Sequence, residues 1–124
     1  MKLGPRQQRW VEALRSGKYE QGHEALHAGN EFCCLGVACD VFKDELSLSV
    51  ELEDGIIFYN GQARVLPTAV KEHLHLANKS GMPKTMGYLQ ISKQLSALND
   101  SGASFETIAD TIEQYADEYF TESV

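Results

Sequence analysis

The side chains with the strongest nucleophilic chemistry are three cysteines, Cys33, Cys34 and Cys39. The pattern predicts that a helix begins at Cys34, and the N-terminus of a helix favours a thiolate. With His23 or His27 as the base, Cys34 would be the nucleophile of a cysteine-dependent hydrolase. The flanking residues are apolar, however, and free cysteine is among the most buried residue types. We therefore favour packing over catalysis for these thiols, and we lean away from an enzyme.

The cysteines and histidines do not form a metal-binding pattern. On a helix, Cys34 and Cys39 would lie about 140° apart, which is too far for two ligands on one face. The two histidine pairs have the wrong spacing or the wrong flanks for a zinc motif, and no glycine-rich phosphate loop is present. We expect no metal, no cofactor and no catalytic residue.

A second group of side chains has the chemistry to hold a small anion. Cationic side chains supply charge-assisted donors, and aromatic rings supply plates on which a base can stack. The candidate ligand-binding residues are Trp10, Arg15, Lys18, Tyr19, Gln21, His27 and Arg64. The expected ligand is a small anion such as a cyclic nucleotide.

The formal net charge of −7 is unevenly distributed. Residues 1–18 carry five basic side chains and one acidic one, whereas residues 105–124 carry six acidic side chains and no basic one. The chain as a whole would repel a long nucleic acid, so we exclude that partner class. A small anion near the basic end would not be repelled in this way.

The elements that would position these residues indicate a single α+β domain over residues 1–124, with about four or five helices packed on a small antiparallel sheet. Apolar periodicity predicts helices over 5–16, 34–45, 67–76, 88–99 and 104–120. The second helix is apolar over most of its girth and should be central, and Gly36 within it indicates close approach of another element. The turns Asp54-Gly55 and Asn60-Gly61 separate apolar runs between residues 48 and 66, which predicts a three-stranded antiparallel meander.

The apolar stretches are too short to span a bilayer, and no signal-peptide pattern follows the first residues. We expect a cytoplasmic protein with reduced thiols and no membrane partner.

Several short motifs occur along the chain, each of them once. They are Trp10-Val-Glu-Ala-Leu-Arg-Ser-Gly-Lys-Tyr19 with Gln21-Gly22, Phe32-Cys-Cys-Leu-Gly-Val37 with Cys39-Asp40, and the later Leu66-Pro67, Leu98-Asn99-Asp100, Ser104-Phe105 and Ile108-Ala109-Asp110. In these motifs the chain resembles a family of small uncharacterised phage and prophage proteins, from which it departs mildly at Ala38. The resemblance implies a viral accessory protein, a class rich in inhibitors of host defence, and it implies no particular reaction.

The leading hypothesis is a non-enzymatic counter-defence binder that sequesters a small nucleotide-type immune signal in the host cytoplasm. One alternative is an inhibitor that binds a host defence protein through its acidic C-terminal helix. The others are a cysteine hydrolase using Cys34 and a structural protein of the virion. A homo-oligomer is compatible with the leading hypothesis.

Overall fold

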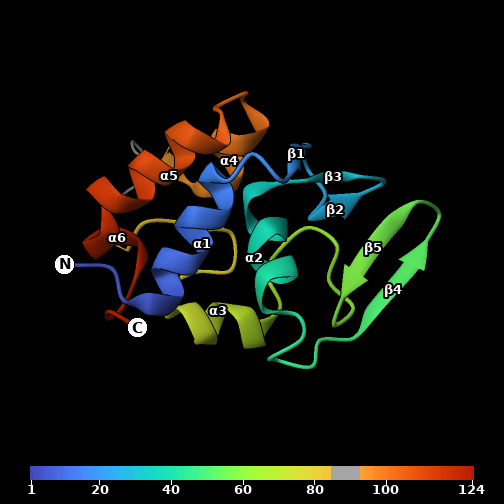
Figure 1. Cartoon of the computed structure of the whole chain (residues 1–124), viewed down its shortest axis with the longest axis horizontal. Coiled ribbons are helices and arrows are strands. Elements are labelled where there is room, and N and C mark those ends of the chain that lie inside the picture. Colours follow the sequence, from blue (N-terminus) through green and yellow to red (C-terminus); the bar gives the residue numbers. More distant parts are fainter. Residues whose placement is uncertain (85–92) are drawn as a thin grey trace.

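Six helices and five short strands make up the part of the chain that the structure describes, residues 1–84 and 93–124. They are α1 (Pro5–Arg15), β1 (Glu20–Gln21), β2 (His27–Ala28), β3 (Glu31–Phe32), α2 (Cys34–Phe42), β4 (Val50–Glu53), β5 (Ile56–Tyr59), α3 (Thr68–Leu74), α4 (Leu95–Asp100), α5 (Phe105–Gln114) and α6 (Ala116–Tyr119). In this computed structural model the helices gather around α1 and α2, and the strands lie to one side of them (Figure 1). The expected single α+β domain is confirmed. Within the described ranges, no helix has the length and apolarity to cross a membrane.

Helix α2 is the centre of the core. It begins at Cys34, as predicted, because the Sγ of Cys33 caps it by accepting a hydrogen bond from the Gly36 N–H at 3.4 Å. Its residues from Cys34 to Cys39 are all buried. The backbone of Leu26 lies so close to Gly36 that a Cβ there would overlap the Leu26 carbonyl. The predicted close approach at Gly36 is therefore confirmed.

Helix α1 packs its predicted apolar face against α2 and α5. Its buried residues are Gln7, Trp10, Val11 and Leu14. The indole Nε1–H of Trp10 donates to the Cys34 carbonyl at 2.9 Å, so this buried ring also has a polar partner on α2. The side chain of Gln7 donates to the Leu74 carbonyl at 2.9 Å, which ties α1 to the end of α3.

The sheet has the order β1-β3-β2-β5-β4, with β1 parallel to β3 and the other neighbours antiparallel. Both Asx-Gly turns form, with positive φ at all four turn residues. The third strand of the predicted meander does not form. Gln62 makes a single bridge to Tyr59, and the strand that pairs with β5 is β2. The reason is that the following backbone has other partners. Leu26 N–H donates to the Ala63 carbonyl, and Leu66 N–H donates to the carbonyl of Lys79.

The C-terminal helices α4 and α6 pack against α5, and α5 packs against α1. The predicted N-cap at Ser104 is confirmed, because its Oγ accepts from the Thr107 N–H at 3.1 Å. The single helix expected over residues 104–120 is broken at Tyr115, whose backbone leaves the helical region with φ −116° and ψ 34°. Part of the helix expected over 88–99 lies outside the described residues, and α4, which begins at Leu95, covers most of the remainder.

Candidate functional site

The structure places the seven predicted ligand-binding residues in several different surroundings. Trp10 lies wholly inside the core and has no exposed surface. The side-chain amide of Gln21 donates to Asn99 Oδ1 at 2.9 Å and to the Ala103 carbonyl at 2.7 Å, so it joins β1 to the α4–α5 connection. Arg64 lines a separate cavity of about 420 Å³ together with the acidic residues Glu24 and Asp100. These three residues do not share a site.

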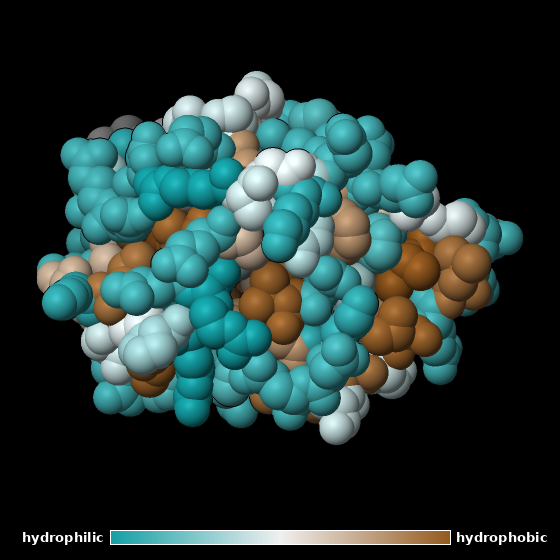
Figure 2. All heavy atoms as spheres, in the orientation of Figure 1, coloured by the Kyte–Doolittle hydropathy of each residue, from teal (hydrophilic) through white to brown (hydrophobic). Residues whose placement is uncertain are grey.

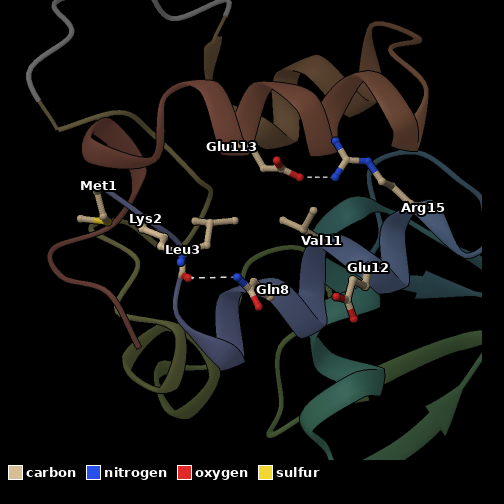
Figure 3. Close-up of a pocket in the computed structure, with 8 residues that line it drawn as sticks. All are labelled: Met1, Lys2, Leu3, Gln8, Val11, Glu12, Arg15 and Glu113. Carbon is tan, nitrogen blue, oxygen red and sulfur yellow. Dashed lines mark hydrogen bonds and ion pairs between the residues drawn. The ribbon is translucent and has the colours of Figure 1, made fainter.

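Arg15 lies against the acidic side of α5 (Figure 3). Its guanidinium donates to Glu106 at 3.2 Å and also to Asp110 and Glu113. The hydrogen bond to Glu113 is the main reason that the pKa of Arg15 lies above its ordinary value. Arg15 and Glu113 border a cavity of about 460 Å³ between α1, α5 and the first three residues. Since three carboxylates already surround this cation, it is poorly placed to attract an anionic ligand.

A second groove runs along the neighbouring side of α1, toward α2, and it brings Lys18 and Tyr19 together. Its volume is about 320 Å³, and its lining residues are Arg9, Glu12, Ala13, Ser16, Lys18, Tyr19 and Val41. Arg9 is held by Glu45 at 2.8 Å and lies over the Phe42 ring. The ammonium of Lys18, by contrast, has no ion pair among the described residues. The groove is therefore lined by one cationic side chain without an ion pair, Lys18, and by one aromatic side chain, Tyr19.

Tyr19 leads from this groove into an aromatic cluster formed by Tyr19, Phe32, His27 and Tyr59. The Tyr19 ring meets Phe32 edge to face at 5.0 Å between centroids. His27 stacks on Phe32 at 3.8 Å, and its Nδ1 lies 2.9 Å from the hydroxyl of Tyr59. Tyr59 is buried, whereas the other three side chains are only partly buried. The cluster therefore presents aromatic surface to solvent beside the groove.

The polar edge of α2 fixes the position of Tyr19. The Tyr19 hydroxyl donates to Asp40 Oδ2 at 2.6 Å, and the ammonium of Lys43 donates to Asp40 Oδ1 at 2.7 Å. Burial acts to raise the pKa of Asp40, but the hydrogen bonds from Lys43 and Tyr19 outweigh it and hold that pKa below its ordinary value. Burial, together with the bond to Asp40, raises the pKa of Tyr19. At neutral pH the pair is a carboxylate and a neutral phenol.

His27 is suited to stacking rather than to proton transfer. Burial is the main cause that lowers its pKa from the ordinary value, and the nearby Asp40 only partly opposes this effect. The ring is therefore neutral at pH 7, with one face on Phe32 and one nitrogen engaged by Tyr59. This arrangement can bind a planar group, and the hydroxyl groups of Tyr19 and Tyr59 are kept protonated by their raised pKa values.

The thiols are not arranged as nucleophiles. Cys34 has no exposed surface, its Sγ lies 3.6 Å from the Leu95 carbonyl, and burial raises its pKa well above the ordinary value. Burial also raises the pKa of Cys33 to about 11. His27, one of the two histidines expected as the base, is engaged with Tyr59 instead. Among the described residues, no group of three His, Cys, Asp or Glu side chains could hold a metal ion.

Four residues of the aromatic cluster and its support were missed from the sequence: Phe32, Asp40, Lys43 and Tyr59. A signal for two of them exists, because Asp40 and Lys43 lie three positions apart and form a polar strip on an otherwise apolar helix. Polar residues in such a place need partners, which Tyr19 supplies here. Phe32 and Tyr59 gave no such signal, since their contacts depend on how the short strands pair.

Residues 5–116 match a domain of unknown function, DUF8296. The matched stretch runs from the first residue of α1 to the first residue of α6, so it contains every residue of the groove and of the aromatic cluster. No curated protein and no solved structure matches the chain. The chain belongs to the DUF8296 family.

Proposed function

We propose that this chain is a non-enzymatic binding protein that holds a small nucleotide-type anion in the groove at Lys18 and Tyr19. One observation carries the proposal. In this groove Lys18, whose ammonium has no ion pair among the described residues, and the aromatic Tyr19 line the same cavity. That ring is continuous with further partly buried aromatic surface at Phe32 and His27.

The size and chemistry of the groove suit such a ligand. Its volume of about 320 Å³ lies at the lower end of the range of about 300–1,000 Å³ that is usual for small-molecule sites. Lys18 would bind a phosphate group, and the Tyr19 ring would stack on the base. The bond from Tyr19 to Asp40 holds the ring in place before binding, which reduces the entropy that the ligand must offset.

A binding role, rather than a catalytic one, accords with the state of the nearby groups. The two tyrosine hydroxyls have raised pKa values, and both oxygens of Asp40 are already hydrogen-bonded. The buried thiol of Cys34 gives the hydrolase alternative little support. The acidic-helix alternative is weakened because Arg15 sits among three of the carboxylates that would contact the partner.

The biological role that we propose is sequestration of a nucleotide immune signal in the host cytoplasm. The resemblance to phage accessory proteins supports this context, and three buried free cysteines accord with a reducing compartment. A protein that holds its ligand without cleaving it would act stoichiometrically, and it would release the ligand intact when it unfolds.

The test is calorimetric titration of the pure protein with a panel of cyclic di- and oligonucleotides, followed by denaturation and chromatographic recovery of the ligand. Lys18→Glu should weaken binding by about tenfold or more, since an attractive charge on the phosphate becomes a repulsive one. Lys79→Glu is the matched control, because it makes the same charge change at another exposed lysine. Tyr19→Ala should also weaken binding.

Three outcomes would contradict the proposal. The first is an absence of binding to every nucleotide in the panel at micromolar concentrations. The second is equal loss of affinity in Lys18→Glu and Lys79→Glu, which would indicate a general charge effect. The third is recovery of a cleaved ligand, which would make the protein an enzyme.

A further inference from the structure

Strand β4 forms an open edge of the sheet. It is the last strand in the order, and no described residue pairs with its outer side. All four of its residues are exposed, including Val50 at 48% and Leu52 at 70%. The β4–β5 hairpin projects away from the helices in Figure 1, and apolar side chains gather over the same region in Figure 2. An exposed apolar edge strand is a ready template for another strand.

The register of the hairpin shows which backbone groups are available. In a two-residue turn at Asp54-Gly55, Glu53 and Ile56 form the closing hydrogen-bonded pair, and hydrogen-bonded pairs then alternate along the ladder. The bond from the Asn60 N–H to the Ser49 carbonyl at 2.8 Å follows this alternation. The N–H and C=O groups of the exposed Val50 and Leu52 consequently point away from β5 toward the open edge.

The two faces of this strand differ in chemistry. Side chains alternate along a strand, so Val50 and Leu52 share one face, and Glu51 and Glu53 share the other. Asp54 follows directly in the turn, and residues 48–59 contain no lysine or arginine. The edge therefore presents an apolar row and an acidic row side by side.

We propose that β4 binds an extended segment of a partner protein in which apolar residues alternate with lysine or arginine. The segment would add a sixth strand to the sheet through the backbone groups of Val50 and Leu52. Its apolar side chains would lie opposite these two residues. Its basic side chains would lie opposite Glu51 and Glu53, at the non-hydrogen-bonded positions where cross-strand side chains are closest.

Charge disfavours a second copy of this chain as the occupant. In an antiparallel pair of β4 strands, Leu52 can lie opposite either Val50 or Leu52 of the second copy. The first register places Glu51 opposite Glu51, and the second places Glu51 opposite Glu53. Like charges directly opposite each other destabilise a sheet, whereas a basic residue at the same position stabilises it.

The experiment measures binding of two capped eight-residue peptides to the whole protein, one alternating lysine with valine and one alternating glutamate with valine. The wild type should bind the lysine peptide in preference to the glutamate peptide. The double variant Glu51→Lys/Glu53→Lys should lose about tenfold in affinity for the lysine peptide and gain affinity for the glutamate peptide, since two cross-strand pairs change sign.

The matched control is Glu20→Lys/Glu31→Lys, which makes the same charge change at the opposite edge of the sheet, where β1 pairs with β3. This control should leave both affinities unchanged. Equal losses in the two double variants would show general attraction to an acidic protein and would overturn the proposal. Hydrogen exchange in the wild type gives an independent reading: the lysine peptide should slow exchange at the Val50 and Leu52 amides, and unchanged exchange there would also overturn it.

Discussion

Replacing Asn99 with alanine should destabilise the protein severely, because this side chain is a fully buried polar junction. Its Oδ1 accepts hydrogen bonds from the Cys34 N–H at 3.1 Å and from Gln21 Nε2 at 2.9 Å. Its Nδ2 donates to the Gly22 carbonyl at 2.8 Å. One amide thus joins α4 to β1 and to the first residue of α2.

The magnitude follows from the groups that the variant leaves without partners. Asn99→Ala would strand the Cys34 N–H and the Gly22 carbonyl, and a buried unsatisfied group costs about 1–3 kcal/mol. Gln21 keeps its bond to the Ala103 carbonyl and is not counted. The expected loss is about 2–6 kcal/mol of the free energy of unfolding, a large share of the roughly 5–15 kcal/mol typical of a domain.

Urea denaturation followed by circular dichroism measures this loss, with Asn30→Ala as the control. Asn30 is exposed, so its replacement should change the unfolding free energy by no more than about 0.5 kcal/mol. If Asn99→Ala loses less than about 1 kcal/mol, the junction does not carry the energy that its hydrogen bonds imply, and the reasoning fails.

Three further predictions concern Gly36, His27 and the two adjacent cysteines. Gly36→Ala should lower the free energy of unfolding by about 1–3 kcal/mol despite the better helix propensity of alanine, because its Cβ would overlap the Leu26 carbonyl; an unchanged thermal midpoint would contradict this. The pKa of His27 is lower in the folded protein than in the unfolded chain, so as the pH first falls below about 6.5 the imidazole is protonated only in the unfolded state. The free energy of unfolding should therefore fall as the pH falls through that window. Urea titration at several pH values measures this profile, and His27→Gln should flatten it. Iodoacetamide at neutral pH should label Cys33 and Cys34 only after unfolding, and rapid labelling of the native protein would refute their assignment as inert core thiols.

Local signals in the sequence were enough to predict much of the fold. The apolar stripe of α1, the start of α2 at Cys34, the two Asx-Gly turns and the cap at Ser104 are each specified by residues within one turn or one hairpin. The features that were missed depend on distant partners. The bond from Leu26 N–H to the carbonyl of Ala63 competes with the third strand of the meander, and no pattern in residues 62–66 reveals it.

The same distinction explains the candidate site. Lys18 and Tyr19 are neighbours in the chain, so any fold that exposes one brings the other close to it. Arg15 is only three residues from Lys18, but its direction from α1 carries it to the acidic residues of α5 instead. Arg64 lines a different cavity together with Asp100, a position that depends entirely on tertiary contacts.

The double cysteine is the most prominent chemical feature of the sequence, but the hydrogen-bonded polar groups of α2 lie on its other edge. Apolar burial fixes α2 in the core and raises the pKa of its thiols, which removes them from reaction. Because α2 is so firmly placed, its few polar residues have fixed positions as well. Asp40, which also accepts a hydrogen bond from Lys43, holds the Tyr19 hydroxyl, and the Tyr19 ring packs against Phe32 beside the groove. A rigid apolar helix with one polar edge therefore fixes the position of Tyr19 beside the groove.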